Sequence, residues 1–451
     1  MKTKLSERLA FGAGGFALEI ITATLSAYLM LYHTNVLGIS AMASGTMFLV
    51  ARAVDAVTDV VMANIADQTR TKWGTYRPYL LFGAVPIGIV FALNFNAPAF
   101  ILHAGGAVKL VWAYITYLLA GSIMATVCGV PFGSLNSVMS TDRYERTVFG
   151  AARSIGGKVA YFTQSMVMPI VIAFGTVNTP MGWRMVGVLF GLFGTIGFLI
   201  CFAGTKEKVA LPPKGESVPL STKMKALGNN GPLYGCAGIL ICYILMFTYF
   251  NTFANYFCIY YAGHPAWTAP FSMIRTICAI GAALMIPSLT KRFEKRHIIC
   301  GGAILCVISF VVLYFVTSFS MMLVSMVVYG IGYGSIMTNV YAMIPEVSDY
   351  GEWKNHVSAP AFVYAVCMFA LKVASGLASY FVGACLELVG FDAALQSQSI
   401  EVQNGIHLWA AVGPMIFAGI IILLTLLMRK LDRKNLNPII EELDARRVSG
   451  Q

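Results

Sequence analysis

The chain has 451 residues, of which 58% are hydrophobic and 11% charged, and its formal net charge is +11. Ordinary soluble domains carry about 25% charged residues. A chain this apolar cannot cover its surface with polar side chains, so its composition argues against a soluble protein and indicates a polytopic membrane protein.

We predict twelve membrane-crossing helices, because apolar stretches of at least the roughly 20 residues needed to span a bilayer recur along the chain. The first stretch continues well past the length of a signal-peptide core, so we expect it to remain as the first helix. The predicted helices cover approximately residues 9–33, 41–66, 78–98, 106–138, 147–176, 184–204, 231–262, 268–290, 298–317, 319–346, 358–389 and 404–428.

Basic residues in the loops and at the ends of these helices are distributed unevenly. If the N-terminus is cytoplasmic, almost all of them fall in cytoplasmic segments, and only Lys109 and Arg184 fall on the opposite side. Cytoplasmic loops of membrane proteins carry an excess of Lys and Arg, so we expect both termini in the cytoplasm and the protein in the cytoplasmic (inner) membrane. Orientation then explains the positive charge, and no nucleic-acid partner is expected.

One long polar segment, residues 205–230, follows the sixth helix. It divides the chain into a six-helix bundle (1–204), a cytoplasmic linker (205–230), a second six-helix bundle (231–430) and a cytoplasmic tail (431–451). This layout resembles that of major facilitator transporters, which bind substrate near the middle of the membrane between two such bundles. We therefore expect an all-α protein with this fold.

Two predicted cytoplasmic turns resemble each other. DQTRTKWGTYRPY follows the second helix and PEVSDYGEWKNH follows the tenth, and each places acids, a glycine and bases together. Such charges either pair across helix ends and lock a closed state, or remain ordinary solvated loop charges. The candidate gating residues, which include one from the segment before the fifth helix, are Asp67, Arg70, Arg77, Arg146, Glu346, Asp349 and Glu352.

The stretch ARAVDAVTDVVMANIAD, residues 51–67, is predicted to cross the membrane although it contains Arg52, Asp55 and Asp59. A charge at the bilayer centre costs about 3 kcal/mol or more, so such residues are usually functional. Asp55 and Asp59 are four residues apart and share one helical face. Two carboxylates this close need a proton or a hard cation such as Na⁺ between them, as in a cation-coupling site. The alternative is a structural ion pair with Arg52 or Lys372.

Further charged residues fall within other predicted helices. Glu19 has no neighbouring base in the sequence, so it either accepts hydrogen bonds from substrate hydroxyls in a polar cavity or is protonated and bonded to another helix. Arg153 and Lys372 can hold a carboxylate or vicinal hydroxyls. Lys158 is expected to extend toward the interface or to pair. Arg275 is left without a role.

Catalytic signatures are missing from the sequence. The chain has no nucleophile elbow, phosphate-binding loop, HExxH motif or glycine-rich dinucleotide turn in a usable context. Its ten cysteines form no CxxC pair and no metal-ligand spacing. We therefore expect neither an enzyme nor a bound cofactor.

Several segments in combination are similar to one known family. They are FLVARAVDAVTD, DQTRTKWGTYRPYLLFGAVP, VPFGSL followed by DRYER, and DYGEWK. The chain resembles the glycoside–pentoside–hexuronide:cation symporters over nearly its whole length. This resemblance implies secondary active symport of a glycoside or uronide with Na⁺, Li⁺ or H⁺, by rocking of two helical bundles around a central site.

The resemblance also implies roles for individual residues. The cation ligands would be Asp55, Asp59 and Thr126, and the substrate-binding residues would be Glu19, Arg153 and Lys372. Only Thr126 had not already been singled out by its residue type and position.

Four positions depart from the family pattern. Val60 replaces the proline that usually follows the second aspartate, and Gly129 and Gly133 replace a sugar-binding aspartate and an aromatic residue. Met337 stands at a tryptophan position. The cation site is thus expected to be retained and the sugar site, including these two glycines and Met337, to be remodelled. We hypothesise a substrate that is bulkier or more acidic than a plain disaccharide.

Other functions stay open at this point. The choice between Na⁺ and H⁺ is not fixed by two carboxylates and a threonine, which can bind either. A cation-coupled carrier of an amphiphile such as a lysolipid, or a membrane sensor that transports nothing, are the alternatives. We expect a single chain in the lipid bilayer to be a complete transport unit.

Overall fold

The computed structural model describes residues 4–140, 142–208, 230–316, 318–355, 360–393, 395 and 397–449. Every named element in these ranges is a helix, which confirms the predicted all-α fold. Most of the predicted linker, residues 209–229, lies outside the described residues.

Contacts divide the chain into two compact units, each of which is described here by itself. The first consists of Met1–Pro213, Asn251–Met273 and Ser379–Ile406, and the second of Lys214–Phe250, Ile274–Ala378 and His407–Gln451. The predicted division into two sequential six-helix bundles remains a prediction.

The first unit contains all described helices before residue 205, two short later helices and the ends of α11, α12, α15 and α16. Its helices are α1 (Leu5–Tyr32), η1 (His33–Leu37), α2 (Ala41–Gln68), α3 (Arg77–Asn94), α4 (Ala99–Leu102), α5 (Gly106–Tyr117), η2 (Leu118–Met124), α6 (Ala125–Met139), α7 (Arg143–Gln164), α8 (Val167–Ala173), α9 (Pro180–Gly204), η3 (Phe257–Tyr261) and η4 (Pro265–Trp267). Ser40 and Asp142 cap α2 and α7 by accepting backbone N–H bonds, as these residue types commonly do.

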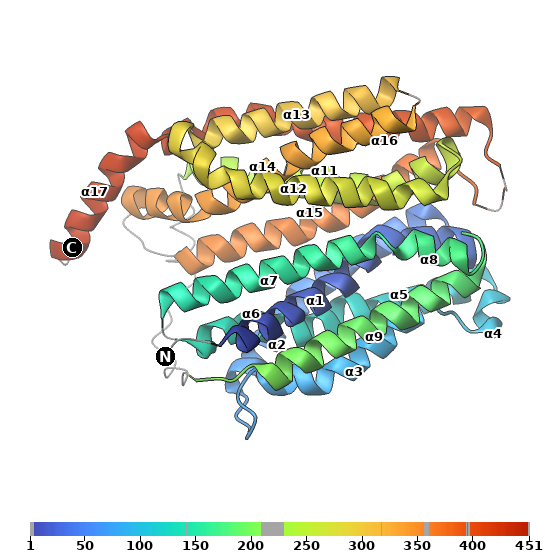
Figure 1. Cartoon of the computed structure of the whole chain (residues 1–451), viewed down its shortest axis with the longest axis horizontal. Coiled ribbons are helices and arrows are strands. Elements are labelled where there is room, and N and C mark those ends of the chain that lie inside the picture. Colours follow the sequence, from blue (N-terminus) through green and yellow to red (C-terminus); the bar gives the residue numbers. More distant parts are fainter. Residues whose placement is uncertain are drawn as a thin grey trace. The chain divides into compact units, whose positions relative to one another are not determined.

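Glycines bring α1 close to α7 and α9 (Figure 1). A Cβ atom on Gly156 of α7 would come within 1.9 Å of the Gly12 carbonyl oxygen, and one on Gly197 of α9 within 2.9 Å of the Ala13 carbonyl oxygen. Only hydrogen fits at such contacts, which are typical of small-residue interfaces between membrane helices. The close approach places Glu19 of α1 directly against α7, where a Cβ on Gly157 would lie 3.2 Å from the Glu19 Cγ.

Hydrogen bonds also tie α1 to the last turns of α11 (Gly231–Tyr256) within the first unit. Thr252 Oγ1 donates to the Ser26 carbonyl oxygen over 3.0 Å, and Asn255 Nδ2 donates to the Ala27 carbonyl oxygen over 2.8 Å. Both donors are buried. Buried polar groups of a membrane protein need such partners because the hydrocarbon region contains no water to replace them.

The second unit is built from the remaining helices. These are most of α11, α12 (Thr268–Arg292), α13 (Lys295–Phe315), α14 (Phe319–Asn355), α15 (Pro360–Leu388), α16 (Ile400–Leu424), η5 (Thr425–Leu431) and α17 (Arg433–Ser449). Helices α13 and α14 pack along each other, again through glycine: a Cβ on Gly332 would lie 2.5 Å from the Gly302 carbonyl oxygen.

Helix α14 is 37 residues long and corrects one prediction. The stretch PEVSDYGEWKN, expected to form a tight turn, continues this helix to Asn355, so Glu346, Asp349 and Glu352 lie on a helix. The turn was predicted from the acids, glycine and bases of this stretch, but these residues lie on a helix that continues through Pro345. Buried Ile344 and Val347 flank the proline, and their packing explains why the helix continues.

Eleven described helical segments are long and apolar enough to cross a membrane. Helix α2 is not among them although it has 28 residues, because its sequence contains Arg52, Asp55, Asp59 and Asp67. The twelfth predicted membrane helix is therefore the one that carries the candidate cation site.

Candidate functional site

The two candidate cation-binding carboxylates of α2 have different partners. Asp55 is buried, and its Oδ2 accepts a hydrogen bond from Arg52 Nη1 over 2.8 Å. Asp59 Oδ1 accepts one from Thr126 Oγ1 of α6 over 2.9 Å. Thr126 is itself buried. The structure thus brings Asp59 and Thr126 together, and it shows Arg52 in the ion pair that the sequence left as an alternative.

A break in helix geometry precedes Thr126. Residues Leu118–Met124 form a π-helix, and α6 begins directly after it. A π-helical turn shifts the face that the following residues present, and such turns occur often at functional sites. Ser122 in this turn donates to the Ala51 carbonyl oxygen over 3.4 Å, which joins the turn to α2. The local irregularity therefore positions Thr126 toward Asp59.

The donor set of this cluster fits a small hard cation. Asp55 Oδ1 is buried and has no hydrogen-bond partner among the described residues. Carboxylate and hydroxyl oxygens are the ligands that such cations prefer. Two carboxylates and the Arg52 guanidinium together leave one negative charge, which one monovalent cation would balance. No group of three or more His, Cys, Asp or Glu side chains that could hold a metal ion occurs in the described part of the chain.

A second cluster lies between α1 and α7. Glu19 is half-buried, interacts electrostatically with Arg153 and Lys158, and hydrogen-bonds to Tyr161. In the sequence Glu19 had no neighbouring base, and the helix contact supplies two. Lys158, for which snorkelling or pairing was expected, lies close enough to Glu19 to interact with it. One carboxylate and two bases leave this cluster with one positive charge.

The two glycines expected to enlarge the substrate site are not required by packing. A Cβ on Gly133 would meet Arg153 Nη1 at 3.7 Å, and one on Gly129 would meet Leu18 Cδ1 at 3.4 Å, both ordinary contact distances. Gly133 and Arg153 are exposed. The Arg153 guanidinium also lies 5.1 Å from the ring centre of buried Phe132. Gly133 therefore leaves accessible space beside a guanidinium group, and Gly129 leaves space beside Leu18.

The remaining substrate candidates belong to the second unit. Lys372 on α15 and Met337 on α14 are both half-buried. Arg275, which the sequence left without a role, is buried under Phe247 with its guanidinium 5.4 Å from the ring centre. Phe247 in turn stacks on Tyr333 at 5.0 Å. The second unit thus contains an aromatic cluster around a buried cation that sequence reasoning did not identify.

The turn between α2 and α3 is organised by a residue that was not predicted. Glu207, in the segment after α9, accepts backbone N–H bonds from Thr75, Tyr76 and Arg77 over 2.8, 2.7 and 3.0 Å. A carboxylate at the start of a helix satisfies unpaired N–H groups and favours the helix dipole. The side chain of Asp67 accepts a bond from the Tyr76 hydroxyl over 2.8 Å, and burial followed by this bond raises the pKa of Tyr76 to about 12.

Three of the candidate gating bases bind backbone carbonyls inside the first unit. Arg70 donates to Asp67 and Thr69, Arg77 donates to Trp73 and Phe202, and Arg146 donates to Ser137 and Ser140. In the second unit, Glu346 accepts from Lys295 over 2.5 Å. Asp349 and Glu352 lie on the same helix, α14. The gating role of these residues stays a prediction.

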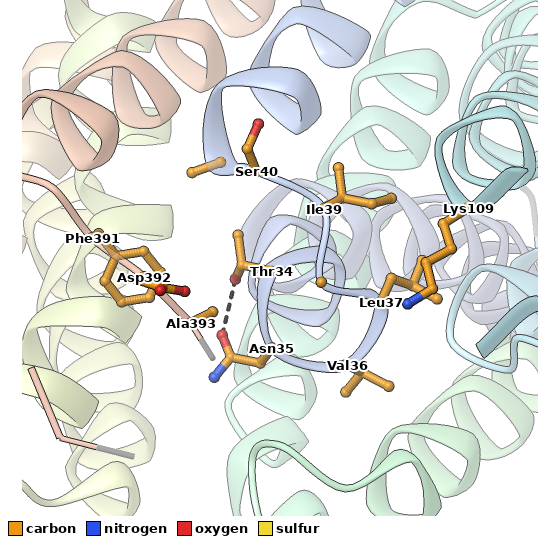
Figure 2. Close-up of a pocket in the computed structure, with 12 residues that line it drawn as sticks. Thr34, Asn35, Val36, Leu37, Ile39, Ser40, Lys109, Phe391, Asp392 and Ala393 are labelled. Carbon is orange, nitrogen blue, oxygen red and sulfur yellow. Dashed lines mark hydrogen bonds between the residues drawn. The ribbon is translucent and has the colours of Figure 1, made fainter. Parts of the chain in front are cut away.

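A polar cavity of about 350 Å³ lies elsewhere in the first unit, where η1 ends (Figure 2). Lys109 and Asp392 line it from two different segments, and Thr34 and Asn35 lie between these segments. Thr34 Oγ1 donates to Asn35 Oδ1 over 2.9 Å, and Asn35 Nδ2 donates to Asn178 Oδ1 over 2.7 Å. None of the residues named as cation or substrate candidates lines this cavity.

Comparison with known families agrees with the observed fold. The family model described as "MFS/sugar transport protein" matches residues 10–433. The chain is therefore a multi-pass membrane transporter of the major facilitator class. Within that class it belongs to the glycoside–pentoside–hexuronide:cation symporter family, as the resemblance implied.

Individual relatives extend over almost the whole chain. The isoprimeverose transporter of Lactiplantibacillus pentosus is 30% identical over 95% of this chain and 89% of its own length. The glucuronide carrier protein homolog of Escherichia coli (strain K12) is 27% identical over 100% of this chain and 98% of its own length. Among solved structures, a bacterial homologue of the human lysosomal transporter Spinster superimposes with a TM-score of 0.72 at 15% identity, covering 96% of this chain and 99% of that one.

Proposed function

We propose that the protein is a secondary active symporter that couples inward movement of a monovalent cation, Na⁺ or H⁺, to uptake of a glycoside or uronide by alternating access. The observation that carries this proposal is the cluster of Asp55, Asp59 and Thr126, contributed by two membrane-embedded segments. Ionisable groups at this depth are expensive to bury and mark ion pathways more often than structural contacts.

The charge of the cluster supports a single monovalent cation. The two carboxylates and the nearby Arg52 guanidinium together carry one negative charge, and a divalent ion would overcompensate it. The oxygen ligands suit Na⁺, Li⁺ or H⁺ rather than a transition metal. Uptake measured under separate Na⁺, Li⁺ and H⁺ gradients would distinguish these three ions.

The second cluster supports an anionic glycoside as the substrate. Arg153 and Lys158 outnumber Glu19, so the surroundings of Glu19 carry a net positive charge. Arg153 can bind a carboxylate through two parallel N–H bonds, while Glu19 can accept bonds from sugar hydroxyls. The space beside Gly133 would admit a bulky group next to this arginine. Among relatives, the one named a glucuronide carrier homolog has a substrate class of this charge.

We further propose that the protein lies in the cytoplasmic membrane with both termini in the cytoplasm, as the distribution of Lys and Arg predicts. Substrate and cation would then move together from outside to inside. In this orientation the turn that Glu207 caps, and the end of α14 with Glu346, face the cytoplasm.

Purified protein reconstituted into proteoliposomes would test this function. Uptake of a glucuronide, a galactoside, isoprimeverose and a lysolipid would be measured under an inward Na⁺, Li⁺ or H⁺ gradient, with a choline gradient as the control. We expect accumulation of the glucuronide above its external concentration with at least one cation. Preference for the neutral galactoside would contradict the anionic-substrate proposal. Cation-driven lysolipid uptake without sugar uptake would instead support a carrier of amphiphiles. The absence of flux for every substrate would support a membrane sensor that transports nothing.

A further inference from the structure

Arg52 occupies part of the candidate cation site. Its Nη1 lies 2.8 Å from Asp55 Oδ2, and the two side chains are 22% and 5% exposed. Arg52 Nε and Asp55 Oδ1 are both buried without a hydrogen-bond partner in the described part of the chain. Arg52 also interacts electrostatically with Asp59. A permanently charged guanidinium group therefore contacts one candidate cation ligand and interacts electrostatically with the other.

A mobile cation held by Asp55 and Asp59 would meet this guanidinium at close range. The Arg52 guanidinium and the bound cation are both positive, so each weakens the binding of the other to the two carboxylates. The loss is largest where little water screens the charges. Full coordination of a cation by Asp55 and retention of the Arg52–Asp55 bond are thus opposed to each other.

We propose that Arg52 is a tethered competitor of the coupling ion: it holds Asp55 when the site is empty, and it leaves Asp55 when an alkali-metal cation binds to Asp55 and Asp59. This inference rests on the proposed function and adds a role for a residue outside the cation ligands. Buried Tyr117, at the end of α5, lies close enough to interact electrostatically with Arg52 and offers its hydroxyl as an alternative acceptor.

The competitor would matter for the step in which the empty carrier returns. Without a cation, Asp55 and Asp59 alone would carry two negative charges through a poorly solvated region. Arg52 halves that charge, so the empty carrier can reorient. Without Arg52 the site would hold its cation more tightly and release it more slowly.

Cation affinity of the purified full-length protein tests this directly. The midpoint concentration for Na⁺ and Li⁺ would be taken from ion-dependent thermal stabilisation, with choline as the blank. Coupling between two sites typically changes affinity by about 5-fold to 150-fold, so we expect Arg52→Gln to raise Na⁺ affinity at least about fivefold. Arg52→Lys, which keeps the charge, should stay nearer to the original protein. Arg184→Gln removes another arginine from a membrane helix and should change nothing.

A second measurement needs no substitution. Phenylglyoxal modifies guanidinium groups, and peptide mass spectrometry can follow Arg52 and Arg184 separately in the same sample. If a cation releases Arg52 from Asp55, Na⁺ should accelerate modification of Arg52 and leave Arg184 unchanged. This readout applies even if the Arg52→Gln variant does not fold.

Three results would overturn the inference. They are a Na⁺ affinity that Arg52→Gln leaves unchanged or lowers, a modification rate at Arg52 that Na⁺ does not raise, and a protein that binds neither Na⁺ nor Li⁺. Any of these can occur while cation-driven uptake persists in proteoliposomes, in which case the proposed function stands and only the competition fails. The absence of any cation-driven uptake by the unmodified protein would instead refute the proposed function.

Discussion

The two charged clusters of the first unit are opposites in charge and in packing. Around Asp55 and Asp59, acids outnumber bases, and the half-buried Arg52 and buried Thr126 lie at hydrogen-bond distance. Around Glu19, bases outnumber acids, and the cluster extends to the exposed Arg153 and Gly133. One cluster suits a small cation and the other suits a larger anion.

This difference indicates how one bundle can serve two solutes. A dehydrated monovalent cation is small, so its ligands must be held in place, and the π-helix before Thr126 and the bond from Ser122 provide that constraint. A glycoside is larger and varies in shape among relatives, so accessible space and a few directed charges are sufficient. Substitutions that affect one cluster and leave the other intact would test whether the two clusters are separate binding sites.

The largest effect is expected from Asp59→Asn. This change removes a charged ligand from the cation cluster, and loss of one partner in a buried charge contact typically costs about 2 kcal/mol or more. Cation-driven accumulation in proteoliposomes should fall by about thirtyfold or more, since 1.4 kcal/mol corresponds to a factor of ten. Downhill substrate exchange should persist.

Asp142→Asn is the control, because Asp142 is an acid of the same unit that accepts the Tyr144 N–H as the cap of α7, where asparagine caps equally well. It should leave accumulation within about twofold of the original protein, as expected for a contact outside the bilayer. Undiminished uphill uptake in Asp59→Asn would remove Asp59 from the cation site.

A pair of glycine substitutions separates packing from open space. Gly156→Ala would place a Cβ 1.9 Å from the Gly12 carbonyl oxygen, whereas Gly133→Ala would meet only Arg153 Nη1 at 3.7 Å. Overpacking costs about 1–3 kcal/mol, so Gly156→Ala should lower the melting temperature clearly. Gly133→Ala should leave it almost unchanged. Equal destabilisation by both would mean that Gly133 serves packing and leaves no room for substrate.

Much of the architecture could be predicted from the sequence because it depends on composition. Long apolar stretches have few alternatives in a bilayer, so the all-α fold and the membrane helices followed from hydropathy alone. Asp55 and Asp59 could be selected because charges in such stretches are costly and their spacing is helical. The ion pair between Asp55 and Arg52 was only one of two interpretations. Sequence spacing shows which residues are neighbours on a helix, but it does not give their side-chain rotamers.

Features that depend on contacts across the sequence could not be predicted. Nothing in the local sequence distinguishes Thr126 from other threonines, because its contact with Asp59 exists only once α6 packs against α2. Only the family resemblance pointed to it. The partners of Glu19 come from α7, and Glu207 caps a helix about 130 residues earlier in the chain. Glu207 had one signal, an acidic residue at the start of a basic segment, which is too common to interpret. The end of α14 was mispredicted because its charged residues suggested a loop, whereas Val347 and Tyr350 between them are buried.

Arg153→Gln should affect the substrate cluster alone. Losing a charge-assisted contact to an anionic substrate costs about 1.5–3 kcal/mol, so glucuronide affinity should fall about tenfold or more. Affinity for a neutral galactoside should change much less, because it has no carboxylate for the guanidinium to bind. Arg184→Gln on α9 serves as the control. An equal loss for both sugars would indicate that Arg153 supports the fold rather than selecting the anion.

The smallest effect is expected at Thr126, whose hydroxyl is a single neutral donor to Asp59 over 2.9 Å. Thr126→Val keeps the shape of the side chain and removes that bond, and one hydrogen bond contributes about 0.5–1.5 kcal/mol. Na⁺ affinity should therefore fall by a factor between about two and ten, with the sugar affinity measured without cation unchanged. Thr126→Ser restores the hydroxyl and should restore most of the affinity. If Thr126→Val instead weakened the sugar and left Na⁺ binding intact, the two clusters would not be the separate sites that their opposite charges indicate.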